Sequence, residues 1–260
     1  MRIALIGTGG LGAPLARALI AKGGVSPDDL TLVNRSGRRP ASLEACRLAT
    51  RIEDAGADVV LLALPPDVAL TGAFPCPGAL VISVMAGVTC AEVAALTGAK
   101  RVVRAMSSPA ADMGLAFSPW HAPDPAHDDI ATTRRLLAAT GIEARVPSED
   151  QIDRFTALTG PVPGFVAACA AAMADHAVRS GIDPGTADRA VRQLFLAAAE
   201  AMREGPTPAR HVSDMIDYAG TTAAGLIALR DAGFQDVIDA GLNAALDRTK
   251  TVGRDRPTSA

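Results

Sequence analysis

Three glycines near the start of the chain have a spacing that could serve phosphate chemistry. The segment Gly7-Thr8-Gly9-Gly10-Leu11-Gly12 follows the apolar run Ile3–Ile6 and precedes a helix-forming stretch. In a GxGxxG turn of this kind, the first glycine permits a tight turn, the second lets the backbone approach a pyrophosphate, and the third lets the helix pack closely on the strand. The N–H groups at the helix start add an attraction for anions. We therefore predict a dinucleotide site formed by Gly7, Thr8, Gly9, Gly10, Leu11 and Gly12.

A basic segment follows the second expected strand, where the ribose of a dinucleotide would lie. A free ribose 2′-hydroxyl calls for Asp or Glu at this point, whereas the chain has Asn34-Arg35-Ser36, followed by Arg38 and Arg39. A guanidinium can pair bidentately with a 2′-phosphate. The segment therefore favours NADP over NAD. The alternative is that these arginines only form a solvated loop.

The first half of the chain alternates β-branched runs with helical stretches. Strands are expected over 3–7, 30–34, 59–64, 80–84, 101–104 and 143–146, and helices over 14–22, 41–51, 90–96 and 132–140. Pro, Ser and Asp punctuate 107–129, which reads as loop. This alternation predicts an α/β fold, with an N-terminal Rossmann-type parallel sheet domain over 1–150 that binds NADP.

After Pro147 the sequence changes in character. From Phe165 onward it is alanine-rich and helix-forming, with breaks at 181–184, 205–208 and 219–220, so we expect an all-α second domain over 151–252. The residues 253–260 are expected to be a disordered tail. Phe165, Cys169, Met173 and Ala177 recur on one helix face, which indicates either packing within the chain or a subunit interface.

Composition limits the remaining classes of function. The net charge of −3 comes from interspersed acids and bases, so no basic face for nucleic acid or anionic lipid is expected. The four cysteines form no CxxC pair, which indicates neither disulfides nor a metal site. The N-terminus lacks the features of a signal peptide, and the longest apolar run, 162–174, is shorter than the roughly 20 residues that span a bilayer. We expect a cytoplasmic protein without a membrane span.

Several segments resemble the pyrroline-5-carboxylate reductases. In the first half these are MRIALIGTGGLGAPLARAL, LVNRS, ADVVLLALPPDV and VISVMAGVTCAEV, and in the second half AAMADHAVRSGI and AGTTAAGLIALRDAGFQDVIDAGLNAALDRT. The resemblance covers nearly the whole chain. It implies an NADPH-dependent oxidoreductase of proline biosynthesis that delivers hydride to a cyclic imine, with a helical dimerisation domain and hence a homodimer or larger assembly.

The resemblance also implies site residues. It places the 2′-phosphate at Asn34, Arg35 and Ser36, and the nicotinamide edge at Ala63, Leu64, Pro65, Ala86 and Gly87. The substrate would lie against Ser107, Ser108, Asp217, Gly220, Thr221 and Thr222. A reduction of this kind needs a proton donor within hydrogen-bond reach of the heteroatom. Thr222 is the donor that the family suggests, and Tyr218 is a second candidate because a phenol is the stronger acid.

Departures from the family pattern cluster around the presumed substrate pocket. Pro65-Pro66 stands where relatives have Lys-Pro, the MPNTPA segment is shortened and lacks its asparagine, and Ala171 takes the place of an expected glutamate. Three hypotheses therefore stay open: a reductase of pyrroline-5-carboxylate or a related imine, a carbonyl (keto acid) reductase on the same architecture, and a nucleotide-binding protein that has lost catalysis. For the second, no lysine is expected at the nicotinamide, and His176 and His211 are the remaining candidate acids.

Overall fold

The computed structural model describes residues 1–160, 162–252 and 254. The chain divides into two compact units, the first formed by residues 1–160 and the C-terminal residues from Ala244, the second by residues 161–243. The predicted tail 253–260 lies outside the described residues except for Arg254. The predicted boundary at residue 150 precedes this division by one helix, α5 (Glu149–Thr159), which packs on strands of the first unit.

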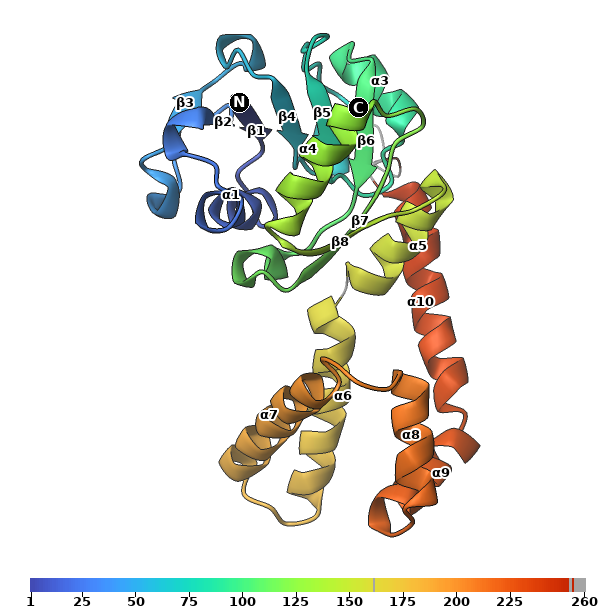
Figure 1. Ribbon diagram of the computed structural model, residues 1–260. Coiled ribbons are helices and arrows are strands. Elements are labelled where there is room, and N and C mark those ends of the chain that lie inside the picture. The colour runs from blue at the N-terminus through green and yellow to red at the C-terminus, as the bar shows by residue number, and fades with distance from the viewer. Residues whose placement is uncertain (161, 253, 255–260) are drawn as a thin grey trace, which may run out of the picture. The chain divides into compact units, whose positions relative to one another are not determined.

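The first unit is built on one eight-stranded sheet with the order β3-β2-β1-β4-β5-β6-β7-β8 (Figure 1). All neighbouring strands are parallel except β6 and β7. The strands are β1 (Ile3–Ile6), β2 (Leu30–Val33), β3 (Arg47–Ala49), β4 (Val59–Leu62), β5 (Leu80–Ser83), β6 (Arg101–Ala105), β7 (Ala116–His121) and β8 (Gly141–Arg145). The predicted α/β class is confirmed.

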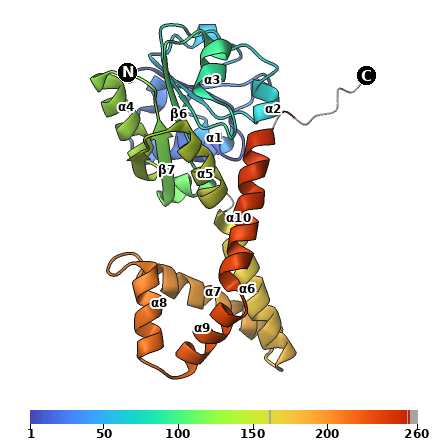
Figure 2. The same ribbon diagram turned by 90° about the vertical axis from the view of Figure 1, so that its right-hand side faces the viewer.

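Helices cover both faces of this sheet, so its central strands are apolar throughout. Ile3 and Leu5 of β1 pack in the cluster that contains α1 (Gly12–Ala21) and α4 (His127–Ala138), and the alternate residues Ala4 and Ile6 pack in the cluster that contains α2 (Pro66–Ala69) and α3 (Cys90–Thr97). Figure 2 shows α4 and α2 on opposite sides of the sheet. Short 3₁₀ turns complete the unit at Pro27–Asp29, Ala41–Leu43, Ile52–Asp54 and Pro109–Met113.

Two sequence expectations in this unit were wrong. The range 41–51 is not a helix: it holds a 3₁₀ turn and the edge strand β3, whose residues pair with Thr31 to Val33 of β2. The range 107–129 is not only loop, because it contains β7, which pairs with both β6 and β8. In both places pairing with a neighbouring strand overrides a local sequence preference.

The second unit is helical. Its helices are α6 (Val162–Arg179), α7 (Pro184–Ala201), α8 (Pro208–Asp217), α9 (Thr221–Asp231) and the first half of α10 (Phe234–Thr251). The helix starts have physical causes: Asp183 accepts a hydrogen bond from Thr186 N–H before Pro184, and Thr207 does the same for Arg210 N–H before Pro208. The predicted breaks between helices are confirmed.

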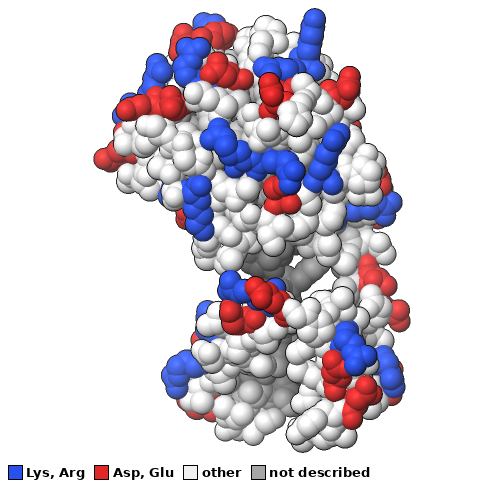
Figure 3. Space-filling view, in the orientation of Figure 1, with Lys and Arg blue, Asp and Glu red and all other residues white. Residues whose placement is uncertain are grey.

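This unit buries little of its apolar surface within the chain. Phe165, Val166, Met173 and Val178 of α6 are all exposed, although α6 packs against α7. By length and composition alone the stretch Glu149–Arg179, which includes residues outside the described ones, could cross a membrane. The expected apolar run, 162–174, lies inside this longer stretch, and a single such helix is weak evidence for a membrane span. Figure 3 shows acidic and basic side chains interspersed over the face that it displays.

Candidate active site

The glycine-rich turn lies between β1 and α1 and is closed tightly against the sheet. Gly7 has φ +94°, and a Cβ atom there would lie 2.6 Å from the carbonyl oxygen of Ala63. A Cβ atom on Gly12 would lie 1.9 Å from the carbonyl oxygen of Gly7, so only glycine permits this approach of helix to strand. Gly9 and Gly10, in contrast, face open space. The turn therefore leaves its backbone accessible at the two positions where a phosphate would approach.

A cavity of about 480 Å³ lies beside the end of β2. Asn34 and Arg35 line it, and the Asn34 side chain donates to the carbonyl oxygen of Arg38 at 2.9 Å and accepts from the Ser36 hydroxyl at 3.0 Å. Arg39 instead donates to the carbonyl oxygen of Glu44 at 3.1 Å. Of the predicted 2′-phosphate residues, Arg35 thus offers a guanidinium on the cavity wall, while Asn34 and Ser36 hold the loop.

Sequence reasoning missed several residues of this cavity. Arg51, Thr50 and Glu53 lie beyond β3 and line it together with Phe74 and Val68. Arg51 donates to the Glu53 carboxylate at 3.1 Å. These residues were hidden because 41–51 was expected to be a helix. Recognising β3 as a strand parallel to β2 would have placed Arg51 at the same edge of the sheet as Arg35.

A second cavity of about 300 Å³ is lined by Gly7, Gly9 and Gly10 of the glycine turn. Most of the residues predicted for the pyrophosphate and the nicotinamide line this cavity, namely Gly7, Gly9, Gly10, Leu11, Ala63, Leu64, Pro65 and Ala86. Val84, Met85 and Met106 also line it and were not predicted. Thr8 receives a hydrogen bond of 3.4 Å from the Asn34 side chain. The carboxyl ends of β1, β4 and β5 therefore bring together residues that are up to 80 positions apart in sequence.

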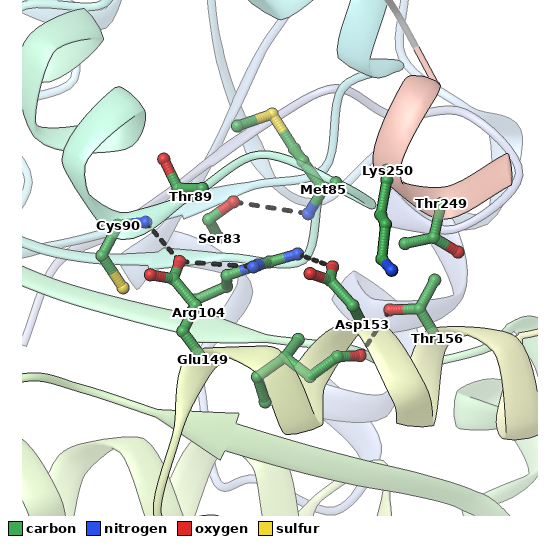
Figure 4. Close-up of polar contacts among 12 residues, drawn as sticks. Ser83, Met85, Thr89, Cys90, Arg104, Glu149, Asp153, Thr156, Thr249 and Lys250 are labelled. Carbon is green, nitrogen blue, oxygen red and sulfur yellow. Dashed lines mark hydrogen bonds and ion pairs between the residues drawn. The ribbon is translucent and has the colours of Figure 1, made fainter. Parts of the chain in front are cut away.

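Gly87 lies just outside this lining, in the turn before α3. Its φ is +68°, and a Cβ atom there would lie 2.3 Å from the carbonyl oxygen of Thr249 in the last turn of α10. Lys250, the next residue, is therefore close in the chain to this contact, and Figure 4 draws it in the same region. A lysine at this place could not be expected from the sequence, because residues 249 and 250 are far from Gly87 in the chain.

The residues predicted for the substrate fall into two groups. Ser107 and Ser108 lie after β6 in the first unit and are 3% and 7% exposed, and the Ser107 hydroxyl accepts a hydrogen bond from Ser118 at 3.0 Å. Asp217, Tyr218, Gly220, Thr221 and Thr222 form the turn between α8 and α9 in the second unit, where all of them are exposed.

The turn between α8 and α9 has an unusual backbone. Ala219 has φ +67°, a conformation that favours glycine, and Gly220 has φ +90° and ψ −161° at the N-cap of α9. Gly220 cannot cap the helix with a side chain, so the N–H groups of the first turn are available to an anion. Tyr218 is 91% exposed.

Burial makes two of the four cysteines poor nucleophiles. All four are free, and burial raises the pKa of Cys90 to about 12 and that of Cys76 to about 11. Both thiols are therefore protonated at neutral pH. Among the described residues, no cluster of three or more His, Cys, Asp or Glu side chains could hold a metal ion.

A buried polar cluster around Arg104 lies close to Cys90 at the start of α3 (Figure 4). Arg104 of β6 forms ion pairs with Glu149 and Asp153 of α5, and its side chain is 1% exposed. Sequence reasoning did not single out this arginine, because its burial depends on α5 covering the end of β6.

A mostly parallel sheet with an open glycine turn and two cavities at the carboxyl ends of its strands is typical of one class of protein, the nicotinamide-dinucleotide-dependent oxidoreductases. The comparisons with known proteins agree. Residues 2–87 match the family model described as NADP oxidoreductase coenzyme F420-dependent, and residues 149–252 match the model described as pyrroline-5-carboxylate reductase dimerisation.

Relatives cover nearly the full length of the chain. It is 30% identical to the pyrroline-5-carboxylate reductase of Pseudomonas aeruginosa over 95% of both chains, and 28% identical to that of Thermus thermophilus over 97% of this chain and 99% of the other. The chain belongs to the pyrroline-5-carboxylate reductase family. A solved pyrroline-5-carboxylate reductase of Coxiella burnetii shares the fold, with a TM-score of 0.81 at 24% identity over 96% of this chain and 97% of the other. So does a Plasmodium falciparum pyrroline carboxylate reductase with NADP bound, with a TM-score of 0.80 at 19% identity over 97% and 98%.

Proposed function

We propose that this protein is an NADPH-dependent reductase of a cyclic imine, with pyrroline-5-carboxylate as its substrate. The observation that carries this proposal is the full-length similarity to pyrroline-5-carboxylate reductases at up to 30% identity, in a family to which the chain belongs. Because the sequence departs from the family pattern around the substrate residues, closely related small imines should be tested as substrates as well.

The residues around the glycine turn and in the two cavities that it lines fit an NADP cofactor. The open backbone at Gly9 and Gly10 would accept the pyrophosphate, and Arg35 on the wall of the larger cavity would pair with the 2′-phosphate. Arg51 lines the same cavity and would add a second guanidinium. When bound, the reduced nicotinamide supplies the hydride for the imine carbon. Its place would be the smaller cavity, at Ala63, Leu64, Pro65 and Ala86.

The α8–α9 turn would hold the substrate and supply the proton. The N–H groups at the start of α9 can bind the substrate carboxylate, and the Thr222 hydroxyl can donate a hydrogen bond to the imine nitrogen. The nitrogen gains one proton as the carbon gains hydride, so the C=N bond becomes CH–NH. Tyr218 is the second candidate donor. Asp217 would add a negative charge near a carboxylate and so influence substrate choice. Ser107 and Ser108 are further candidates for substrate contact, as the family resemblance implies.

We also propose a cytoplasmic homodimer, or a larger assembly of such dimers, acting on a small molecule. The exposed apolar face of α6, defined by Phe165, Val166 and Met173, would be covered by a second copy of the chain. It lies within the region that matches the dimerisation model, residues 149–252. A subunit interface also explains the apolar character of the Glu149–Arg179 stretch without a membrane.

The decisive experiment is a substrate screen with the purified protein and NADPH, followed by the loss of NADPH absorbance. We expect turnover with pyrroline-5-carboxylate and little or none with 2-oxo acids. Turnover with 2-oxo acids alone would establish the carbonyl reductase instead. NADPH binding without turnover of any cyclic imine or 2-oxo acid would indicate a protein that has lost catalysis.

A further inference from the structure

Arg104 is a buried charge whose two ion-pair partners among the described residues lie on one helix. Its two terminal nitrogens reach Glu149 and Asp153, which are four residues apart on α5, and the Nη1 to Oε1 distance to Glu149 is 3.3 Å. The Nε atom is buried and has no hydrogen-bond partner among the described residues. A buried guanidinium must be paired. Its position at the end of β6 is therefore tied to the first two turns of α5.

Glu149 makes a second contact that connects this pair to the cofactor side of the sheet. The same Oε1 atom that faces Arg104 accepts a hydrogen bond of 2.6 Å from the backbone N–H of Cys90, the first residue of α3 (Figure 4). Asp153 makes no such contact to α3 in any hydrogen bond of the described residues. The carboxylate of Glu149 thus bridges the buried arginine and the start of α3.

The start of α3 fixes the turn that contains Ala86 and Gly87. Thr89 and Glu92 form a capping box there, and Arg254 donates to the Gly87 carbonyl oxygen at 3.0 Å and to Glu92 at 2.8 Å. Arg254 therefore holds one side of the turn, and Glu149 holds the other side at Cys90. Ala86 lines the smaller cavity, so a shift of this turn changes the shape of that cavity.

We propose that Arg104, acting through Glu149, is a positioning residue that sets the Ala86–Gly87 turn for the nicotinamide half of the cofactor. The inference rests on the proposed function, because it takes the smaller cavity as the nicotinamide site. The guanidinium orients the carboxylate, and the carboxylate holds the N-terminus of α3. The adenosine half, bound at Arg35 beyond β2, does not depend on this link.

The test compares two ligands on four variants. NADPH occupies both halves of the site, whereas adenosine 2′,5′-bisphosphate lacks the nicotinamide and probes the 2′-phosphate end alone. Glu149→Ala removes the acceptor of Cys90 N–H, and Glu149→Gln keeps an oxygen that can accept it. Asp153→Asn is the matched control, since it removes a carboxylate charge from the same arginine and the same helix without touching α3. Arg104→Lys keeps the charge but loses the two-pronged geometry.

We expect Glu149→Ala to weaken NADPH binding about tenfold, as for one lost hydrogen bond to a charged group, with adenosine 2′,5′-bisphosphate binding nearly unchanged. Glu149→Gln should restore most of the loss, Arg104→Lys should show the same selective loss to a smaller degree, and Asp153→Asn should bind NADPH like the parent.

Three results would contradict this inference while the proposed function stands. They are an equal loss for both ligands in Glu149→Ala, an equal loss of NADPH binding in Asp153→Asn, and unchanged NADPH binding in folded Glu149→Ala or Arg104→Lys. A parent protein that binds neither ligand would instead refute the proposed function and the inference with it.

Discussion

Arg35 and Arg51 come from different strand ends and line one cavity. Arg35 follows β2 and Arg51 follows β3, so residues from two strand ends line the cavity that we propose for the 2′-phosphate, although Arg51 also donates to the Glu53 carboxylate. Arg39, in the same loop as Arg35, is engaged with the carbonyl oxygen of Glu44. Arg35 is therefore the candidate residue of this loop for recognising the 2′-phosphate, and Arg39 is the control for it.

Replacing Arg35 with Asp should reverse the preference for NADPH over NADH. Loss of a charge-assisted pair costs about 1.5–3 kcal/mol, or roughly 10- to 100-fold in affinity, and the new carboxylate would repel a 2′-phosphate while accepting a hydrogen bond from a 2′-hydroxyl. The dissociation constants of both cofactors measure the effect. Arg39→Asp makes the same charge change in the same loop and should leave the preference unchanged. If the Arg35→Asp variant prefers NADPH over NADH as strongly as the parent does, this loop does not recognise the 2′-phosphate.

Thr222 and Tyr218 can be separated by two small substitutions. Thr222→Ala and Tyr218→Phe each remove one hydroxyl, and a positioned proton donor contributes roughly 10²- to 10⁴-fold to the rate. We expect Thr222→Ala to lower kcat strongly and Tyr218→Phe to lower it less, since Tyr218 is 91% exposed, with NADPH affinity nearly unchanged in both. Full turnover in both variants would place the donor elsewhere, and Lys250 beside Thr249 would be the next residue to replace.

At the scale of elements, helix α3 shows how local sequence and distant contacts combine. The Thr89 hydroxyl accepts from Glu92 N–H at 3.2 Å, and the Glu92 carboxylate accepts from Thr89 N–H at 2.7 Å. Desolvation by itself raises the pKa of Glu92, but the hydrogen bonds from Thr89 and the ion pair with Arg254 outweigh it and lower that pKa below 4.5. Glu92 therefore contributes stability that is present above pH 4.5 and is lost as the pH falls through its lowered pKa.

Glu92→Gln should lower the free energy of unfolding by about 0.5 kcal/mol at neutral pH, because Gln still completes the capping box while the charge is lost from a partly exposed ion pair. The difference from the parent should vanish once the pH lies well below 4.5. Urea unfolding at neutral and acid pH measures both values. Glu204→Gln, on an exposed loop, controls for net charge. A difference that persists unchanged in acid would mean that the charge of Glu92 does not stabilise the fold.

The elements themselves show what could be predicted from the sequence. The central strands were predictable because burial on both faces makes them continuous apolar runs, as in Val59–Leu62. Strand β3 could not be recognised, because its three residues Arg47–Ala49 have helix-forming side chains and depend on pairing with β2. Arg51 was missed with it. The Arg104 cluster could not be predicted for a related reason. A charged residue in a strand is expected to be exposed, whereas Arg104 is buried where α5 packs on β6.

The whole molecule leaves an apolar face on α6 that its own chain does not cover. We expect a homodimer or larger assembly, because exposed Phe165, Val166 and Met173 would otherwise stay in water. Light scattering at micromolar concentrations measures the mass. Met173→Lys should shift the protein toward the monomer, whereas Leu115→Lys, at a residue 65% exposed in the first unit, should not. A monomeric mass for the parent across that range would contradict the interface.

The division of the chain has a consequence for how the protein is made. Residues 161–243 form the second unit, yet the first unit includes residues from Ala244 onward, among them Thr249 and Arg254, which contact Gly87. A ribosome adding about 5 to 20 residues per second needs roughly 4 to 17 s to pass from Gly160 to Ala244. During that time the sheet can form, but Thr249 and Arg254, which contact the turn at Gly87, have not yet been synthesised. We therefore expect the proposed phosphate end of the cofactor site to form in the nascent chain seconds before the proposed nicotinamide end.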